Sequence, residues 1–340
     1  MKNLLIITQK VDENDQLLGF FINWIACFAR KFDKVTVLCL EKGKFNLPPN
    51  VKVLSLGKDY GAGKLKQLSN FYFLIFNLHK DYDAVFVHMN PIWAVAGGLF
   101  WRLTSKKIFL WYTSGGVTAK LKLAEKFADI IFTASKESFR LSSKKVIVTG
   151  HGIDTDLFKP DPNAKTNDGI LKILSVGRIS PVKNYRTLIE AVQILANQKI
   201  NFFVTIIGEP ALKQDRQYEE GIKKKIKDLG LEKKFEFKGK IGHGYLTSYY
   251  QASNLFVHLS KTGSLDKSLL EAMACGITVL SCNESSGAFL PKEYTFNEAN
   301  SEELAERIKF AVLYPKNLRD YVVRHHNLSD LIAMLASRMS

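Results

Sequence analysis

Residues 255–282 combine residue types and spacing that suit a phosphate-binding loop. An apolar, β-favouring run is broken at Gly263, and apolar side chains then recur at helical spacing as far as Gly276. The pattern therefore predicts a strand, a loop, a helix and a second strand. In such a βαβ unit the loop opens onto the helix N-terminus, where free backbone N–H groups and the helix dipole favour an anion. We expect a phosphate beside Gly263, with Ser264 or Asp266 capping the helix.

Glu271 lies in this predicted helix, away from the apolar stripe and four residues after Lys267. Residues four apart are neighbours on a helix surface, so the local pattern favours a solvated pair between Lys267 and Glu271. The alternative is that the carboxylate of Glu271 binds a ligand. The helix pattern by itself gives no ligand for it.

Two cations lie together in residues 176–184, Val-Gly-Arg-Ile-Ser-Pro-Val-Lys-Asn, between a predicted strand and a predicted helix. A nucleotide diphosphate needs cations that do not titrate near neutral pH. Arg178 offers a bidentate fork and Lys183 a mobile point charge, which suits a diphosphate. The alternative is that both are ordinary surface charges.

His88 ends another predicted strand, at residues 83–88. In an open parallel sheet the residues just past the carboxyl ends of the strands face the ligand crevice, so His88 is a candidate site residue. An ordinary capping or hydrogen-bonded histidine is an equally good interpretation, because histidine is only intermediate in its burial preference.

Strands and helices alternate twice along the chain, on either side of a proline-containing linker at residues 159–163. Before the linker we expect strands at 3–8, 34–40, 83–88, 107–112, 128–134 and 145–149, and helices at 20–31 and 64–80. After it we expect strands at 171–176, 202–207 and 235–239, and helices at 185–197, 215–230, 302–313 and 318–337, besides the 255–282 unit. This alternation predicts an α/β protein with two doubly wound Rossmann-like domains facing a central cleft. We place the domains at 1–158 and 159–318.

Three motifs occur in one order and at a spacing known from a single family. They are Gly-His-Gly-Ile-Asp at residues 150–154, the Arg178 to Lys183 segment, and the Glu-Ala-Met-Ala-x-Gly segment that starts at Glu271. On these motifs the chain resembles family 4 of the retaining glycosyltransferases, which have the GT-B fold. The resemblance implies a hexosyltransferase of polysaccharide biosynthesis that moves a sugar from a nucleotide diphosphate donor to a glycan or lipid-linked acceptor. It implies an acceptor-side first domain, onto which residues 319–340 pack back, and a nucleotide-sugar-binding second domain.

The resemblance also assigns roles in donor binding. Arg178 and Lys183 contact the donor diphosphate, while Glu271 accepts hydrogen bonds from the ribose hydroxyls. Gly19, in the loop after the first strand, approaches the donor phosphate across the cleft. Backbone groups at Ile241 contact the base.

The catalytic positions implied by the resemblance and by strand-end placement are His88, Ser114, Arg178 and Lys183. Ser114 stands where the family usually has a histidine that points into the sugar site. Gly263 stands where many members have a second glutamate, eight residues before Glu271. Donor phosphates can still bind the backbone N–H groups of Gly263, Ser264 and Leu265, but a carboxylate near the sugar is lost. The identity of the sugar therefore stays open.

No cofactor other than the nucleotide-sugar co-substrate is expected, and no metal. Asp154-Thr155-Asp156 spells the Asp-x-Asp of metal-dependent glycosyltransferases, but those enzymes have a different fold. The family fills this position without a metal. We therefore expect the diphosphate charge to be neutralised by protein groups.

The net charge of +15 is uneven, since residues 1–150 carry 22 basic and 11 acidic side chains. A basic N-terminal half implies an anionic partner, either a phosphorylated acceptor or an acidic membrane face. Nucleic acid is not expected, because the sequence shows no helix-turn-helix, zinc-finger or aromatic RNA-binding motif. The predicted helix at 64–80 is apolar nearly all round, which fits either a core helix or a membrane-facing one.

The sequence predicts a cytoplasmic protein, with peripheral contact at the inner face of the membrane. The N-terminal apolar run is too short for a signal peptide, and the longest uncharged apolar run, residues 92–101, is about half of what a bilayer crossing needs. The four cysteines show no Cys-x-x-Cys spacing, which favours buried thiols in a reducing compartment.

Three other functions compete with a glycosyltransferase. A sugar-nucleotide epimerase of similar fold would change a free sugar nucleotide without an acceptor. A catalytically impaired nucleotide-sugar-binding scaffold, suggested by Ser114 and Gly263, would bind a donor without turnover. A nicotinamide dehydrogenase is disfavoured, because no Gly-x-Gly-x-x-Gly follows the first strand.

Overall fold

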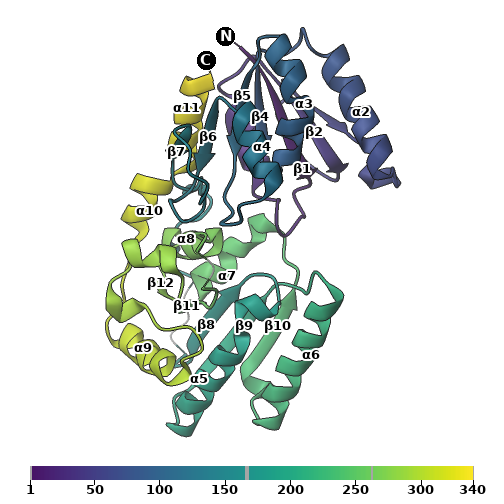
Figure 1. Cartoon of the computed structure of the whole chain (residues 1–340). Helices are drawn as coiled ribbons and strands as arrows, with labels where there is room; N and C mark the ends of the chain where they lie inside the picture. Colours follow the sequence, from purple (N-terminus) through teal and green to yellow (C-terminus); the bar gives the residue numbers. More distant parts are fainter. Residues whose placement is uncertain (1, 165–167, 262, 340) are drawn as a thin grey trace. The chain divides into compact units, whose positions relative to one another are not determined.

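The computed structural model describes residues 2–164, 168–261 and 263–339. The chain forms two compact units. Unit 1 comprises the described residues up to Asp154, Gly242–Gly244 and the described residues from His325 onward, and unit 2 comprises Thr155–Ile241 and Tyr245–Arg324. Each unit is built on one parallel sheet with helices packed against it, so the predicted α/β class with two doubly wound sheets is confirmed (Figure 1).

Unit 1 contains a seven-stranded parallel sheet with the order β3-β2-β1-β4-β5-β6-β7. Its strands are β1 (Asn3–Val11), β2 (Lys34–Lys42), β3 (Val51–Ser55), β4 (Ala84–His88), β5 (Lys107–Trp111), β6 (Ile130–Thr133) and β7 (Val146–Val148). The strand order reverses between β1 and β4, which makes that junction the switch point of the sheet, where ligands of such folds bind.

Helices cover both faces of this sheet, because successive side chains of a strand point to opposite faces. On β1, Leu4 and Ile6 join the core cluster formed with α1 (Phe21–Ala29) and α11 (Leu328–Met339). Leu5 and Ile7 join the other cluster, which lies against three helices. These are α2 (Lys64–Asn77), α3 (Pro91–Leu103) and α4 (Ala119–Phe127). The continuous apolar run of β1 is thus buried on both faces, as in other parallel sheets.

Several elements of unit 1 differ from the sequence-based expectation. β1 continues to Val11 and β2 to Lys42, where a loop was expected, because the two strands stay paired and Lys10 bridges to Glu41 with Nζ–Oε1 of 2.7 Å. The apolar run at 92–101 lies within α3, whose first residue is Pro91. Within the described part of the chain, no helix is long and apolar enough to cross a membrane.

The single helix expected at 318–337 is two helices, α10 (Arg319–His326) and α11. The backbone of Ile153 interrupts it: Ile153 N–H donates to the His326 carbonyl at 2.7 Å, and Leu328 N–H donates to the Ile153 carbonyl at 2.9 Å. These bonds take two backbone groups out of the helical ladder, so the chain turns between the helices.

Unit 2 contains a five-stranded parallel sheet with the order β10-β9-β8-β11-β12. Its strands are β8 (Leu171–Val176), β9 (Phe202–Ile207), β10 (Phe235–Gly239), β11 (Leu255–His258) and β12 (Thr278–Ser281). Its α-helices besides α10 are α5 (Tyr185–Asn197), α6 (Lys213–Asp228), α7 (Leu246–Ala252), α8 (Lys267–Ala274) and α9 (Ser301–Leu313). Short 3-10 turns of unit 2 occupy Pro181–Lys183, Glu232–Lys234, Glu284–Ala288 and Lys292–Tyr294; Lys58–Tyr60 is a 3-10 turn of unit 1, and His243–Tyr245 is one where the chain returns to unit 2. The switch point of this second sheet lies between β8 and β11.

The chain passes into unit 2 at Thr155, slightly before the linker that the prolines mark. Phe158 is fully buried, and the Arg319 guanidinium donates to the carbonyls of Thr155 at 2.9 Å, Phe158 at 2.8 Å and Ala274. Residues 155–158 and 319–324 therefore lie with unit 2, whereas we predicted 155–158 in the first domain and, from the resemblance, 319–324 packed onto it.

Candidate functional site

The carboxyl edge of the second sheet, at its switch point, brings together two loops that are far apart in sequence. One follows β8 and runs from Gly177 to Asn184, and the other follows β11 and ends at Asp266, just before α8. Because β8 and β11 are neighbours in the sheet, these loops meet at the position where doubly wound folds bind ligands.

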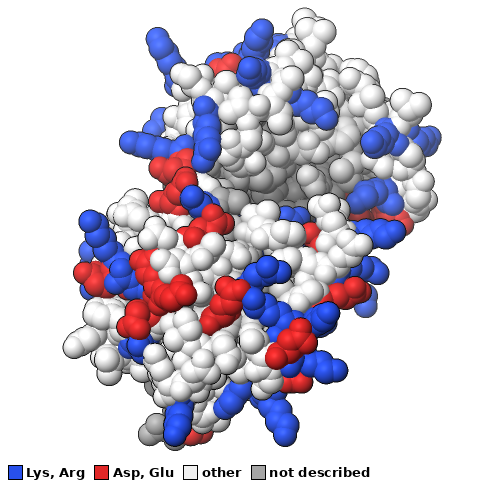
Figure 2. Space-filling model, turned by 60° about the horizontal axis from the view of Figure 1, so that its bottom comes forward, with Lys and Arg blue, Asp and Glu red and all other residues white. Residues whose placement is uncertain are grey.

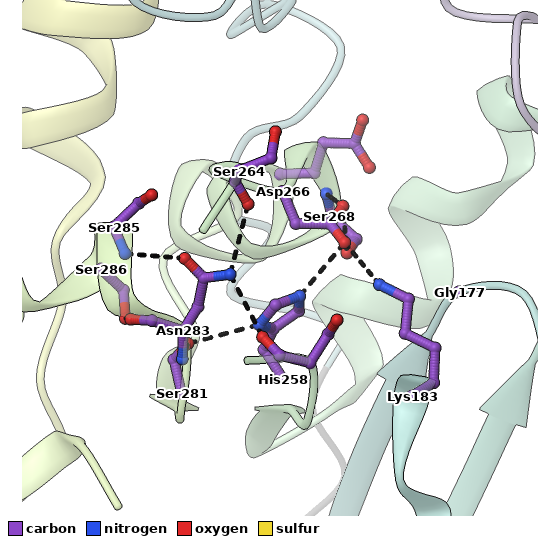
Figure 3. A network of polar contacts seen from close by, with 12 residues as sticks. Gly177, Lys183, His258, Ser264, Asp266, Ser268, Ser281, Asn283, Ser285 and Ser286 are labelled. Atoms are coloured by element: carbon purple, nitrogen blue, oxygen red, sulfur yellow. Dashed lines mark hydrogen bonds and ion pairs between the residues drawn. The ribbon is translucent and has the colours of Figure 1, made fainter. Parts of the chain in front are cut away.

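Lys183 crosses from the first loop to the second. Its Nζ lies 2.6 Å from Oδ2 of Asp266, and its side chain is 19% exposed. Gly177 makes room for this path, since a Cβ added there would lie 3.2 Å from Cε of Lys183. Figure 3 shows the lysine reaching toward Asp266 from the β8 side.

Asp266 is the hub of the polar network in Figure 3. Its Oδ2 also accepts from Nε2 of His258 at 3.1 Å, and its Oδ1 accepts from Ser268 N–H at 3.3 Å, which caps α8 as expected. Burial opposes ionisation, but the Lys183 ammonium and the His258 hydrogen bond hold the pKa of the Asp266 carboxyl well below its usual range. The carboxylate is therefore ionised at neutral pH.

His258 was not singled out by the sequence, although it ends β11 just as His88 ends β4. Its ring is buried, with Nδ1 3.3 Å from Oγ of Ser281. Burial lowers the pKa of His258 against the opposing pull of Asp266. The ring is thus neutral at pH 7, and because an ionised Asp266 can only accept, the network assigns the proton to Nε2.

Asn283 anchors the loop between β11 and α8. Its Nδ2 donates to the carbonyls of Ser260 at 3.1 Å and Ser264 at 3.2 Å, while Ser285 Oγ donates to the Gly263 carbonyl. Leu265 is buried beneath the loop. The backbone of the expected phosphate loop is therefore fixed by side chains that follow β12.

Glu271 is buried, so the prediction of a solvated Lys267–Glu271 pair is wrong. The Tyr250 hydroxyl, on α7, donates to its Oε2 at 3.1 Å. The cause is that α8 is covered on every side: all residues from Ser268 to Ala274 are buried. Burial also lowers the pKa of Lys267 to about 8, although the Glu271 and Asp266 carboxylates oppose this.

Arg178 follows Gly177 directly and is exposed. In the part of the chain that the structure describes, its guanidinium makes no hydrogen bond or ion pair, so it can bind an anion from solvent. Ile241 is half-buried in the loop after β10, at the same edge of the sheet as Lys183.

The remaining predicted residues belong to unit 1, at the carboxyl edge of its own sheet. His88 is buried at the switch point, with Nδ1 3.1 Å from Thr8 Oγ1 and its ring stacked on Phe21 at 3.9 Å between centroids. Ser114 follows β5 and is half-buried, with Oγ 3.4 Å from the N–H of Gly116.

Gly19 has a local packing reason to be glycine. Its N–H donates to the Asp15 carbonyl at 2.9 Å, and a Cβ added there would lie 2.5 Å from that oxygen and 2.9 Å from the Glu13 carbonyl. Any side chain would force the turn open.

Among the described residues, no group of three or more His, Cys, Asp or Glu side chains is placed to hold a metal ion. Asp154, the first residue of the Asp-x-Asp triplet, accepts a hydrogen bond from Asn23 Nδ2 at 2.9 Å. The triplet thus has a structural contact within unit 1.

Residues 158–325, nearly the whole of unit 2, match the family model described as glycosyl transferases group 1. This segment is a group 1 glycosyltransferase domain. The group 1 domain contains Arg178, Lys183, Asp266 and Glu271, so the network in Figure 3 lies inside the matched region.

Curated relatives are similar in sequence to part of this chain. Mannosylfructose-phosphate synthase of Agrobacterium fabrum is 29% identical over 150 residues, which is 41% of this chain and 33% of that protein. The 2-deoxystreptamine N-acetyl-D-glucosaminyltransferase of Niallia circulans is 23% identical over 241 residues, which is 62% of this chain and 60% of that protein. The chain thus spans less than two thirds of the length of these relatives.

Solved structures resemble the chain over its full length. Anabaena Alr3699/HepE in complex with UDP and glucose has a TM-score of 0.81 at 18% identity, covering 100% of this chain and 99% of that one. Sucrose-phosphate synthase from Thermosynechococcus elongatus has a TM-score of 0.77 at 17% identity, covering 99% and 98%. At these identities the likeness shows a shared fold, and the predicted GT-B fold is confirmed.

Proposed function

We propose that the chain is a retaining glycosyltransferase of family 4 that moves a hexose from a nucleotide diphosphate donor to a glycan or lipid-linked acceptor. The observation that carries this proposal is the position of Lys183 beside the capped start of α8, at the switch point of a group 1 domain. A mobile cation and backbone N–H groups at that edge suit a diphosphate.

Two protein groups neutralise the donor diphosphate in this proposal. Arg178 is exposed and supplies a guanidinium fork, and Lys183 supplies an ammonium from the same loop. Support comes from the solved structure of similar fold, Alr3699/HepE, which was determined with UDP and with UDP-glucose.

Glu271 binds the ribose hydroxyls in this proposal, with its carboxylate held in place by the Tyr250 hydroxyl. A buried carboxylate gains from further hydrogen-bond donors, and two ribose hydroxyls provide them. Backbone groups near Ile241 contact the base.

The proposed reaction requires no protein side chain as a general base. In the retaining mechanism implied by the resemblance, the leaving phosphate takes the acceptor proton on the same face of the sugar. The role of Arg178 and Lys183 is to stabilise negative charge as it develops on that phosphate.

Metal independence follows from this proposal, because protein cations neutralise the diphosphate. We expect EDTA to leave turnover nearly unchanged. Loss of activity with EDTA, restored by Mg²⁺ or Mn²⁺, would contradict the assignment.

The first test is a thermal-shift panel with UDP-, GDP- and ADP-sugars, because a ligand that binds only the folded state raises its stability by mass action. We expect one nucleotide series to raise the melting temperature and the other two to have little effect. No shift with any series would contradict the proposal. The anomeric configuration of the product, read by NMR, then tests retention.

A nucleotide-sugar-binding scaffold without turnover is the second candidate. It is favoured by Ser114 and Gly263, which replace family side chains near the sugar, and by the ion pair that already engages Lys183. Donor binding without transfer to any acceptor would support the scaffold. Conversion of the free sugar nucleotide without an acceptor would instead indicate an epimerase.

Peripheral contact with an anionic membrane, at the cytoplasmic face, is proposed for unit 1. α2 and α3 pack together through Phe76 and Phe100, with centroids 4.5 Å apart, yet both leave large apolar side chains exposed. These are Leu65, Leu68, Phe73, Phe76, Leu99 and Leu103, which we call the α2–α3 apolar surface.

The charge of unit 1 also favours an anionic surface. Unit 1 carries 23 basic and 13 acidic side chains, a net charge of +10, whereas unit 2 carries 25 basic and 20 acidic side chains, a net charge of +5. Figure 2 shows one face of the molecule, on which lysine and arginine side chains are spread widely over the surface. Exposed apolar groups among lysines suit an anionic lipid surface.

A further inference from the structure

The cation proposed for the donor diphosphate is already paired within the protein. Asp266 lies 2.6 Å from the Lys183 ammonium, at the position where the resemblance would put a phosphate. A donor that binds Lys183 therefore meets a fixed negative charge of the protein as well as a positive one.

Asp266 cannot easily leave the site when a ligand enters. One of its oxygens is held by the N–H and hydroxyl of Ser268 at the start of α8, at 3.3 and 3.2 Å. The other is held by the buried His258 ring at 3.1 Å. The carboxylate thus keeps its place even if Lys183 turns toward a phosphate.

A fixed negative charge acts differently on the two nucleotides that such an enzyme handles. The terminal phosphate of a free nucleoside diphosphate loses a second proton near pH 6, whereas the same phosphate esterified to a sugar cannot. Above that pH the free diphosphate therefore carries one negative charge more than the nucleotide sugar. The carboxylate of Asp266 therefore repels the free diphosphate more strongly than the nucleotide sugar.

We propose that Asp266 is a specificity-determining residue of the donor site, which weakens binding of the free nucleoside diphosphate relative to the nucleotide sugar. This inference rests on the proposed donor site. Its consequence is that the site favours entry of the donor and release of the diphosphate product. Lys183 is left with enough attraction for the donor, because Arg178 adds a second positive charge at the same edge.

The test compares UDP with UDP-glucose on the whole protein by calorimetry at pH 8, in wild type and Asp266→Asn; if only the GDP or ADP series responds in the thermal-shift panel, the corresponding diphosphate and its glucose ester replace them. Asparagine keeps the shape and is a good N-cap, so α8 should stay capped. We expect the ratio of the UDP to the UDP-glucose dissociation constant to fall about fivefold to tenfold, because UDP gains more from removal of the charge. Asp266→Ser, which also caps a helix without charge, is the second variant if the first does not fold.

The matched control is Glu190→Gln. Glu190 is also a half-exposed carboxylate that binds a lysine, Lys225, with Oε1–Nζ of 2.5 Å, but it lies on α5 at its contact with α6. Its removal changes the charge of unit 2 equally. We expect the ratio of the two dissociation constants to stay within about twofold of wild type, since the charge is not in the loop.

A pH series separates repulsion from simple positioning of Lys183. At pH 5.5 the terminal phosphate of UDP is largely singly charged, so the wild type and Asp266→Asn ratios should converge. If Asp266→Asn weakened both ligands equally at both pH values, Asp266 would only hold Lys183 in place and the inference would be overturned.

An unchanged ratio in Asp266→Asn, with both ligands bound by wild type, would overturn this inference alone. Absence of binding of either ligand by folded wild type, together with no response in the GDP and ADP series, would overturn the proposed function and this inference with it.

Discussion

Each unit has a lysine at the carboxyl edge of its sheet, near the switch point. The two lysines differ in the number of carboxylates that surround them. In unit 1, Lys10 of β1 lies 2.7 Å from Glu41, 3.2 Å from Asp15 and 3.4 Å from Asp12. In unit 2, Lys183 after β8 has Asp266 at 2.6 Å.

The difference distinguishes a structural cation, Lys10, from the cation that we propose binds the donor, Lys183. Burial would lower the pKa of Lys10, but hydrogen bonds to Glu41 and Asp15 raise it instead. Three carboxylates more than balance its charge and tie β1, β2 and the following loop together. Lys183 has one balancing carboxylate and lies beside a helix start and Arg178, so its edge keeps positive potential for an anion.

Substitution of Lys183, Arg178 and Lys10 tests this difference directly. Lys183→Ala and Arg178→Ala should each weaken UDP binding about tenfold to a hundredfold, since a charge-assisted hydrogen bond contributes roughly 1.5–3 kcal/mol. Lys10→Ala should change UDP binding less than about twofold, because the charge of Lys10 is already balanced. Calorimetry on all three variants measures this, with uridine as the phosphate-free control. Unchanged UDP affinity in folded Lys183→Ala and Arg178→Ala would make these residues surface charges.

Asp266 should also matter for stability. Asp266→Asn should lower the free energy of unfolding at pH 7 by about 1–2 kcal/mol, because hydrogen bonds to an ionised acceptor are lost. The folded-state pKa of Asp266 lies below its unfolded value, so this stabilisation is present above about pH 4 and is lost as the pH falls further. Urea unfolding of both proteins between pH 7 and pH 3 should show the difference narrowing only below about pH 4. A difference that grew on acidification would show that the sign is wrong.

Within unit 2, a Glu271 variant distinguishes the proposed ribose contact from the proposed phosphate contacts. Glu271→Gln should weaken uridine and UDP alike by about fivefold, near 1 kcal/mol, because an amide still accepts one hydrogen bond but without the charge. Lys183→Ala should leave uridine nearly unaffected. A loss confined to UDP in Glu271→Gln would move Glu271 from the ribose to the phosphates.

A last prediction concerns the α2–α3 apolar surface of unit 1, where we expect only a weak effect. Binding to anionic vesicles should weaken as salt rises, because screening shortens the attraction. Phe73→Ser should weaken it further, since the Phe73 side chain is 66% exposed and has apolar surface to insert. Sedimentation with neutral and anionic vesicles measures both, with Phe73→Leu as the apolar control. Equal retention by the two vesicle types would rule out an electrostatic contribution.

The sequence pattern correctly predicted helices and strands that depend mainly on neighbouring residues. β8, β9 and α5 begin and end at the expected residues, because an apolar run, a glycine-containing loop and a helical stripe follow one another without ambiguity. The capping role of Asp266 followed from its place before the helix. The double alternation of strand and helix predicted the fold class.

Contacts between distant segments could not be predicted in this way. Lys183 and Asp266 are 83 residues apart and meet only because β11 inserts beside β8. The burial of Glu271 depends on Tyr250 of α7, a helix that we did not predict from the sequence. The break between α10 and α11 likewise depends on Ile153, more than 170 residues earlier.

The packing of α11 into the core of unit 1 also affects the order in which the chain can fold during synthesis. Leu328, Leu331 and Leu335 of α11 complete the core in which Leu4 and Trp24 are buried, so the first strand of unit 1 needs a partner helix made about 320 residues later. Most of unit 2 is synthesised before that helix. The α11 face of β1 therefore stays uncovered during most of the synthesis of unit 2. During that interval the apolar residues that α11 later covers are the part of the nascent chain most exposed to chaperones and to aggregation.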